Sequence, residues 1–338
     1  MAGAARTLVT GGAGFIGSHL VDRLVDDGAA VTVLDDLSTG ARDNLAAAAA
    51  RGDVRVVEGS ILDERAIDTA MAGVDRVYHL AVACVRSSLG APLDNHAVNA
   101  GGTIKVLEAA RAAAVARFVY CSSSEVYGTT SSEPLSELTT PCRPVTVYGA
   151  AKLAGELYTL AYFRTYGLPA TVVRPFNAYG AREPDQGTRA EVIPRFTIRI
   201  LNGLPPMIFG DGSQGRDFTH VSDTVRGVVL AGRSDRLIGE TVNLGCGRLV
   251  TIAGLARRVA QACGRNDLAA EHLPARPGDV HHLTADTTRA GALLGFETRI
   301  GLEAGLADYV GWFKTRHPDP AALLERDPIN WRLAERAS

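Results

Sequence analysis

A glycine-rich segment near the start of the chain constrains the fold more than any other feature. Thr10–Gly17 reads TGGAGFIG and follows Thr7–Val9, a short apolar stretch rich in β-forming residues. Phe15–Val25 has a helical pattern, because its apolar residues recur at intervals of three and four. A second apolar strand, Val31–Leu34, comes next. The order strand, glycine turn, helix and strand predicts one βαβ unit of a parallel sheet.

The glycines of this turn predict a site for an anionic ligand. Gly11 permits the tight turn, Gly14 lets the backbone approach a pyrophosphate, and Gly17 lets the helix pack closely on the strand. The helix N-terminus, at Phe15 and Ile16, offers unpaired N–H groups and the positive end of the helix dipole. A helix-capping turn without a ligand would not account for the whole arrangement.

Asp35 indicates which dinucleotide the turn would bind. It ends the second strand, 18 residues after Gly17. A carboxylate at this point can accept both hydrogen bonds of an adenosine ribose diol, and it would repel a 2′-phosphate. The sequence therefore predicts NAD as the cofactor rather than NADP.

Strand and helix patterns alternate through the first half of the chain. This alternation predicts an α/β fold with a doubly wound, parallel Rossmann sheet. Further strands are expected at Val54–Val57, Arg76–Leu80, Phe118–Cys121 and Thr171–Val173, and helices at Glu64–Met71, Leu93–Ala114 and Tyr148–Tyr166. After about Tyr179 come loops and helices at Ile193–Leu201, Val221–Ala231, Ala253–Ala262 and Leu302–Trp312.

The change of rhythm predicts a division of the chain. We expect residues 1–178 to form the NAD-binding domain, with segments of about 215–245 returning to it. Residues 179–316 would mainly form a smaller α/β lobe that binds the substrate, and residues 317–338 would form a surface tail.

Composition excludes several classes of partner. The 338 residues carry 35 basic and 37 acidic side chains without a basic stripe or tail, so nucleic acid is not expected. No apolar run reaches the roughly 18 residues that a membrane span needs. The odd number of cysteines, with no CxxC pair and no zinc-like cluster, predicts reduced thiols, no metal site and a cytoplasmic protein. These cysteines are Cys84, Cys121, Cys142, Cys246 and Cys263.

Tyr148 and Lys152 form a candidate catalytic pair. They are four residues apart at the start of a predicted helix, which places both side chains on one face. A nearby ammonium favours the phenolate and so lowers the pKa of a phenol. A tyrosine activated in this way can take the proton of a sugar hydroxyl while hydride leaves the same carbon. Such a spacing alone is usually a helix surface pair, and the dinucleotide turn is what makes a catalytic role credible.

A polar segment follows the strand that ends at Cys121. Ser122–Ser124 and Glu125 come directly after it, and in a parallel sheet ligands bind beyond the carboxyl ends of the strands. A serine hydroxyl there can donate a hydrogen bond to the reacting oxygen. An ordinary polar turn is the alternative interpretation of the serine run.

Taken together, these motifs resemble a known family. The chain is similar to the extended short-chain dehydrogenases/reductases of the sugar-nucleotide epimerase/dehydratase group, from about residue 6 to about residue 315. The resemblance rests on TGGAGFIGSHL, Asp35, HLA at His79–Ala81, SSSEVYG, YGAAK, RPFNAYG at Arg174–Gly180, GRDFTHV at Gly215–Val221 and RPGDV at Arg276–Val280.

The resemblance implies roles for the residues around the cofactor. Tyr148 would be the base, Lys152 would bind the nicotinamide ribose and tune Tyr148, and Ser123 would orient the substrate hydroxyl. Leu80 and Ala81 would join the glycine turn in contacting NAD.

On the substrate side the resemblance implies a UDP-sugar ligand. Asn177 resembles the residue that contacts the sugar diphosphate. Arg216 and Arg276 resemble the arginines that bind the pyrophosphate, where a planar bidentate donor suits the ligand. Asp279 is expected to order the loop of Arg276 rather than to touch substrate. Arg86 is a further candidate, as a partner for the carboxylate of a uronic acid.

Ser124 and Glu125, also candidate catalytic residues, bear on which product forms. The group shares oxidation at carbon 4 of the sugar, and the 4-keto intermediate is then turned over, dehydrated or decarboxylated. Glu125 resembles the dehydratase base and the decarboxylase glutamate, but Ser124 stands where the 4,6-dehydratases carry an acidic Asp. The similar decarboxylases carry an arginine beside the segment aligned with Leu283–Asp286, and this chain does not.

These departures favour NAD-dependent 4-epimerisation of the hexose or hexuronate of a UDP-sugar. A 4,6-dehydratase and a UDP-glucuronate decarboxylase are the enzymatic alternatives, and the type of sugar is left open because Leu283, in the sugar pocket, is intermediate in size. An NAD(H)-binding regulatory protein is the non-enzymatic alternative, although such relatives tend to lack the Tyr or the Lys. The resemblance also implies a homodimer joined through the helices at Leu93–Ala114 and Tyr148–Tyr166, which would otherwise be buried within the monomer.

Overall fold

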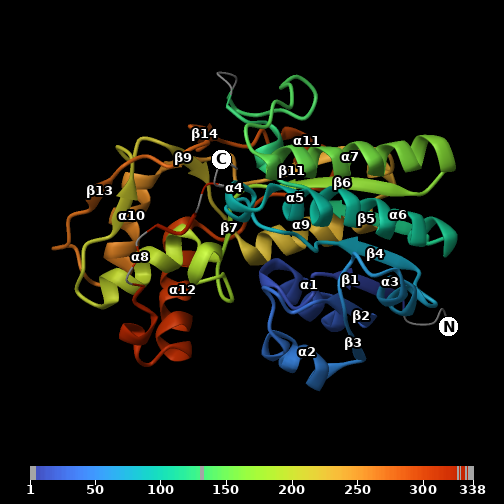
Figure 1. Ribbon diagram of the computed structural model, residues 1–338, viewed down its shortest axis with the longest axis horizontal. Helices are drawn as coiled ribbons and strands as arrows, with labels where there is room; N and C mark the ends of the chain where they lie inside the picture. Colours follow the sequence, from blue (N-terminus) through green and yellow to red (C-terminus); the bar gives the residue numbers. More distant parts are fainter. Residues whose placement is uncertain (1–4, 130–132, 326, 328, 332, 334–338) are drawn as a thin grey trace, which may run out of the picture.

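A seven-stranded parallel sheet forms the centre of the protein (Figure 1). The computed structural model describes residues 5–129, 133–325, 327, 329–331 and 333. The strands lie in the order β11-β6-β5-β4-β1-β2-β3. They span β1 (Arg6–Thr10), β2 (Ala30–Asp35), β3 (Val54–Glu58), β4 (Arg76–His79), β5 (Arg117–Cys121), β6 (Ala170–Pro175) and β11 (Thr241–Leu244). The strand order reverses at β1, which lies between β2 and β4, and ligands of such sheets bind beyond this point.

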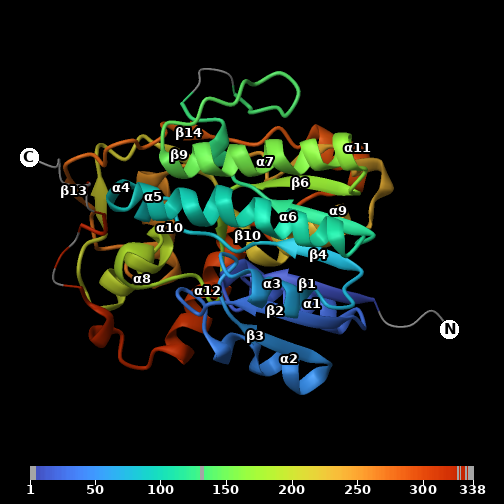
Figure 2. The same cartoon turned by 45° about the vertical axis from the view of Figure 1, so that its right-hand side comes forward.

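Helices cover both faces of the sheet, which confirms the predicted doubly wound α/β class. One apolar core lies between the sheet and α1, α2, α9 and α11. The other lies between the sheet and α3, α6 and α7, and Figure 2 shows α6 and α7 side by side along that face. These helices are α1 (Phe15–Asp26), α2 (Ala46–Arg51), α3 (Glu64–Met71), α6 (Thr103–Ala112), α7 (Val147–Tyr166), α9 (Val221–Arg233) and α11 (Thr288–Leu294).

A second group of elements packs at one end of the sheet, around its own apolar core (Figure 1). Its helices are α8 (Val192–Leu201), α10 (Ile252–Ala262) and α12 (Leu302–Arg316). Its short strands are β7 (Ala178–Tyr179), β8 (Met207–Phe209), β9 (Gly215–Asp217), β10 (Thr219–His220), β12 (Leu249–Thr251), β13 (Glu271–Leu273) and β14 (His282–Leu283). The chain crosses between the two groups more than once, since α9 packs against the central sheet and β11 is one of its strands.

The helix predicted at Leu93–Ala114 is present from Pro92 to Ala112, and it contains a π-helical segment. The structure has α4 (Ser87–Gly90), α5 (Pro92–His96), a π-helical turn (Ala97–Gly102) and then α6. Within this stretch the Asn95 and Asn99 side chains donate to the carbonyl oxygen of Ala83, at 3.1 and 2.9 Å. The paired glycines Gly101 and Gly102 weaken a regular helix, and these side-chain bonds tie the distorted turn to the loop after β4.

Part of the segment expected to form a surface tail lies outside the described residues. In the described part of this segment, Asn330 is buried and donates to the carbonyl oxygen of Ala190 at 3.0 Å. The ring of Trp331 meets that of Phe209 edge to face at 4.6 Å. This part of the tail therefore packs against the second group of elements. In the described part of the chain, no helix combines the length and the apolar character that crossing a bilayer requires.

Candidate active site

The glycine turn joins β1 to α1 at the centre of the sheet. Gly11 has a φ of +70°, and a Cβ there would lie 2.7 Å from the backbone nitrogen of Ala81. A Cβ on Gly17 would lie 2.0 Å from the carbonyl oxygen of Gly11, so helix and strand approach too closely for any side chain. A Cβ on Gly14, which caps the helix before Phe15, would meet only the Gly11 carbonyl, at 3.2 Å. Gly14 is therefore open on the side where a pyrophosphate would approach.

Asp35 lies at the carboxyl end of β2, next to this turn. Its Oδ2 accepts the backbone N–H of Ala13 and its Oδ1 that of Leu37, both at 2.9 Å. Burial raises the pKa of the Asp35 carboxyl, and these two bonds oppose the rise. Each carboxylate oxygen keeps a lone pair beyond the bond it accepts, so the group can still bind a ribose diol. The residues of the turn and of Asp35 fit an NAD molecule.

A buried hydroxyl–imidazole network holds the backbone beside the turn. The Thr10 Oγ1 atom accepts the N–H groups of Leu80 and Ala81, both at 3.2 Å, and lies 2.6 Å from the His79 Nδ1 atom. The other ring nitrogen of His79 lies 3.0 Å from Thr103 Oγ1. Burial lowers the pKa of His79 to about 3, so the ring is neutral. Sequence reasoning missed Thr10 and His79, although their place at the ends of neighbouring strands was a usable signal.

The structure places Tyr148 and Lys152 on successive turns of α7. The helix begins at Val147, after Thr146, whose hydroxyl accepts the N–H of Gly149 at 3.1 Å. Lys152 is 2% exposed, and its ammonium donates to the Cys121 carbonyl oxygen at 2.6 Å. Burial lowers the pKa of Lys152 to about 8.

The environment of Tyr148 raises the pKa of its phenol. Burial is the main cause, the charge of Glu125 adds to it, and a hydrogen bond with Ser123 opposes it. The expected lowering of the Tyr148 pKa is therefore not achieved by the protein's own groups, since loss of water around the phenolate outweighs them.

The serine segment forms a short 3₁₀ turn (Ser124–Val126) that packs against the start of α7. The Ser123 hydroxyl caps this turn by accepting the N–H of Glu125 at 3.2 Å. Ser124 is buried and Glu125 is half-buried. Burial raises the pKa of the Glu125 carboxyl, and the charges of Arg216 and Arg276 oppose the rise. The predicted serine and glutamate residues thus lie beside Tyr148 and within the field of both arginines.

Arg216 and Arg276 converge on one carboxylate. Arg216 belongs to β9 and Arg276 to the loop after β13, yet both donate to Oδ1 of Asp279, at 2.7 and 2.6 Å. The structure therefore brings together two guanidinium groups that are 60 positions apart in the sequence. The shared carboxylate holds both in place, in agreement with the ordering role expected of Asp279.

Arg86 and Asn177 differ in their surroundings. Arg86 is buried and paired with Glu191, and it also donates to the carbonyl oxygen of Arg189, both at 2.7 Å. It lines a small hollow together with Glu125, Thr146 and Arg276 among other residues. The side-chain oxygen of Asn177 is buried and has no hydrogen-bond partner in the described part of the structure. Because an unsatisfied buried acceptor costs about 1–3 kcal/mol, this atom is suited to a donor on a ligand.

The sheet, the glycine turn and the tyrosine–lysine helix define a dinucleotide-dependent enzyme of the Rossmann type. The sequence profile of the NAD dependent epimerase/dehydratase family matches residues 7–245. The chain belongs to this family, and NAD is its cofactor.

Curated relatives and solved structures cover almost the whole chain. It is 38% identical over 319 residues to a UDP-glucose 4-epimerase of Mycolicibacterium smegmatis, covering 92% of this chain and 99% of that protein. It is 37% identical over 320 residues to a dTDP-glucose 4,6-dehydratase of Streptomyces niveus, covering 91% and 93%. The structure of a UDP-glucose 4-epimerase with UDP-glucose from Thermotoga maritima matches with a TM-score of 0.87, 36% identity and coverage of 92% and 99%. Relatives of similar identity therefore include both epimerases and dehydratases.

Proposed function

We propose that the protein is an isomerase that inverts carbon 4 of the hexose or hexuronate of a UDP-sugar through a transient 4-keto intermediate. One observation carries the choice over dehydration: Ser124, a buried hydroxyl, stands between Ser123 and Glu125. Expelling the 6-oxygen needs a general acid beside the base, and a hydroxyl is a poor acid. Inverting carbon 4 needs only a group that removes and returns the proton of its hydroxyl.

Tyr148 and Ser123 supply that group. Bound NAD would accept and return the hydride, and its cationic ring would add positive charge beside the phenol. The Tyr148 oxygen, as the phenolate that this added charge would favour, takes the proton of the 4-hydroxyl and becomes the phenol, and the Ser123 hydroxyl, which is hydrogen-bonded to Tyr148, orients the reacting oxygen. The same phenol returns the proton when the keto group is reduced from the other face. Lys152 supports the reaction by holding a positive charge behind Tyr148.

The second lobe would hold the nucleotide. Arg216 and Arg276 present adjacent guanidinium groups to the pyrophosphate, already aligned by Asp279. Charge-assisted bonds of this kind are about twice as strong as neutral ones. Asn177 would donate its side-chain N–H to the sugar diphosphate and accept a sugar hydroxyl at its unpaired oxygen, and Arg86, which lines the hollow, would face a sugar carboxylate. This arrangement supports the proposed division of the chain into a cofactor domain and a substrate lobe.

A 4,6-dehydratase is the second candidate, and Glu125 is the observation that favours it. Burial raises the pKa of its carboxyl, as an acid–base catalyst near neutral pH requires. The charge of Glu125 also raises the pKa of Tyr148. The relative from Streptomyces niveus supports the same alternative.

Nuclear magnetic resonance of the sugar protons tests the proposal. The purified protein is incubated separately with UDP-glucose, UDP-glucuronate and UDP-N-acetylglucosamine, with Tyr148→Phe as the control. We expect inversion at carbon 4 for one of these sugars and no turnover by the variant, which should still bind NAD. A 4-keto-6-deoxy product would overturn the choice of epimerase, and a pentose product would indicate decarboxylation. Full activity in Tyr148→Phe would refute the mechanism.

We also propose that the protein is a homodimer. Apolar side chains on α5, α6 and α7 are exposed in the single chain: Leu93 (83%), Ile104 (38%), Leu157 (58%) and Tyr166 (58%). Pairing these helices across a two-fold axis would bury them in an isologous interface.

A further inference from the structure

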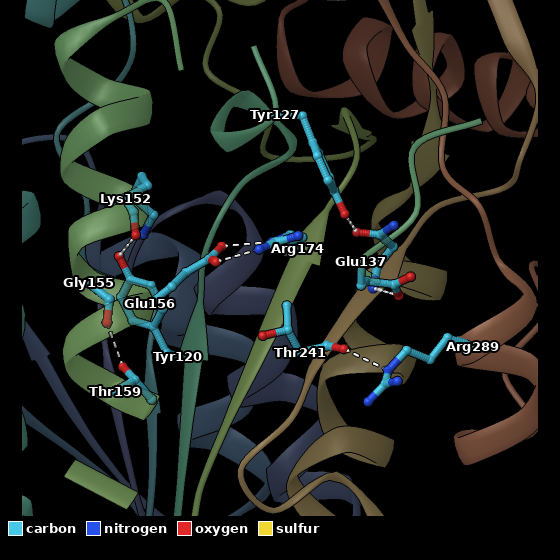
Figure 3. A network of polar contacts seen from close by, with 11 residues as sticks. Tyr120, Tyr127, Glu137, Lys152, Gly155, Glu156, Thr159, Arg174, Thr241 and Arg289 are labelled. Atoms are coloured by element: carbon cyan, nitrogen blue, oxygen red, sulfur yellow. Dashed lines mark hydrogen bonds and ion pairs between the residues drawn. The ribbon is translucent and has the colours of Figure 1, made fainter. Parts of the chain in front are cut away.

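A third residue continues the series of Tyr148 and Lys152 along α7. Glu156 is four residues beyond Lys152, so the three side chains lie on one helix face. Its side chain is 2% exposed, and its two carboxylate oxygens accept hydrogen bonds of 2.9 and 2.7 Å from Arg174 of β6. Figure 3 shows this bidentate contact between α7 and β6.

The ion pair of Glu156 and Arg174 is also contacted on the Arg174 side, by Tyr127. The Arg174 guanidinium lies over the ring of Tyr127, 4.7 Å from its centroid. The Tyr127 hydroxyl donates to the Asn243 side-chain oxygen at 2.8 Å. A buried ion pair repays little of its desolvation cost, so its presence is weak evidence of a role in stability. A carboxylate held in this way one helical turn from Lys152 calls for another explanation.

The charges around Lys152 provide that explanation. The other titratable groups facing it come from β4, β5 and α7, and they are His79, Tyr120, Cys121 and Tyr148. Each is neutral near pH 7. Burial lowers the pKa of His79 to about 3, raises that of Cys121 to about 11, and raises those of both tyrosines. Among the described groups that face Lys152, Glu156 therefore carries the negative charge.

We propose that Glu156 is a positioning residue, whose carboxylate, fixed by Arg174, keeps the Lys152 ammonium charged beside Tyr148. Burial alone disfavours the charge on Lys152, because the side chain has lost its water. The Cys121 carbonyl oxygen and the ring of Tyr120, 4.4 Å from the ammonium, are dipolar partners. Glu156 adds a negative charge, which its ion pair with Arg174 offsets in part. The importance of this charge for turnover rests on the function proposed above, whereas its effect on Lys152 does not.

Arg174 has a distinct part in this arrangement. A carboxylate buried without a cationic partner takes up a proton and loses its charge. The bidentate contact with Arg174 supplies that cationic partner and holds the carboxylate of Glu156 in place.

The low number of lysines makes a direct test practical. The chain contains three, Lys105, Lys152 and Lys314. Lysine labelled with carbon-13 at the ε position gives three signals, which Lys105→Arg and Lys314→Arg assign. The titration of Lys152 is then followed in the NAD-loaded protein, with and without Glu156→Gln. We expect its pKa, about 8 in the parent protein, to fall by roughly one unit in the variant, the lower end of the effect of a nearby opposite charge. An unchanged pKa in a folded variant would overturn the inference.

A second variant covers the case in which Glu156→Gln does not fold. That substitution leaves Arg174 buried without its partner, whereas Glu156→Gln combined with Arg174→Gln leaves no unpaired buried charge. The double variant removes the carboxylate and should also lower the pKa of Lys152. Glu64→Gln is the matched control, because Glu64 pairs with the exposed Lys105 at 2.9 Å and lies outside the site. It should leave the Lys152 titration unchanged.

The pH dependence of turnover separates this inference from the proposed function. If Lys152 must be charged for turnover, activity falls on the alkaline side as it loses its proton. This limb should move about one pH unit lower in Glu156→Gln, in step with the titration of Lys152. A shift in the lysine titration without a shift of the limb would uphold the charge effect and refute the role assigned to Lys152 in catalysis. A limb that moves while the Lys152 titration stays fixed would overturn the inference itself.

Discussion

Gly17→Ala tests the close approach of α1 to the glycine turn. The added Cβ would lie 2.0 Å from the Gly11 carbonyl oxygen and 2.9 Å from both the Gly11 carbonyl carbon and the Gly12 Cα, whereas real Cβ contacts stay beyond 3.0 Å. All three atoms belong to the backbone, so no side chain can move away. The helix and the turn must separate by about 1 Å, which strains the bonds from Gly14 N–H to Gly11 O and from Gly11 N–H to Leu34 O.

The size of the effect follows from these contacts. Overpacking costs about 1–3 kcal/mol, and each strained hydrogen bond adds about 1 kcal/mol. Alanine returns up to about 1 kcal/mol through its better helix propensity. We expect the free energy of unfolding to fall by about 3 kcal/mol and the purified variant to retain little NAD, because the helix N-terminus is displaced.

Urea denaturation and the NAD content of the purified protein measure both effects. Gly311→Ala is the matched control, because Gly311 also lies in a helix, α12, and a Cβ there would meet nothing within 4 Å. It should stabilise the protein by about 0.5–1 kcal/mol. The reasoning is refuted if Gly17→Ala unfolds within about 0.5 kcal/mol of the parent, or if the two variants change stability in the same direction.

Three further changes have defined outcomes. Arg276→Ala should weaken UDP binding about 10- to 100-fold by calorimetry, because a charge-assisted bond is lost, while Arg265→Ala, on the surface, should not; equal losses would contradict the pyrophosphate role. Burial lowers the pKa of His19 from 6.5, its value in an unfolded chain, to about 4 in the folded protein. Between these two values the unfolded chain binds more protons, so the stability of the folded protein falls as the pH drops through this window. His19→Asn should flatten the pH dependence of the free energy of unfolding, measured by urea denaturation, by up to about 1.4 kcal/mol per pH unit in this window, and an unchanged slope would exclude the buried neutral ring. Leu157→Glu should yield monomers in sedimentation experiments and Leu138→Glu, an exposed loop position, should not; a dimer in both cases would place the interface elsewhere.

Local patterns were sufficient for much of the fold. The helices at Glu64–Met71 and Tyr148–Tyr166 lie within one residue of their predicted bounds, because an amphipathic period or a capping residue marks each of them. Six of the seven strands of the central sheet were predicted for a similar reason, since buried parallel strands are short, continuous apolar runs, whereas β11 was not predicted. The strands of the second lobe were not predicted. Most have two or three residues, too few for any period, and only their partners define them.

The π-helical segment within the helix predicted at Leu93–Ala114 shows what a local pattern omits. The apolar spacing is helical throughout, and the side chains of Asn95 and Asn99 bind the loop after β4. These contacts depend on the tertiary structure, so helix propensity could not indicate the change in helical hydrogen bonding.

The candidate site also has features that follow from local spacing and features that depend on tertiary contacts. The sequence by itself determined the glycine turn and the placing of Tyr148 and Lys152 on one helix face, because both depend on spacings of a few residues. Only the tertiary structure decided that Arg216 and Arg276 share Asp279, that Lys152 is bonded to the end of β5, and that Arg174 fixes Glu156. These contacts join residues far apart in the chain, and burial sets the pKa of every group involved in proton transfer. Desolvation is a property of the packed molecule, and no spacing along the sequence contains it.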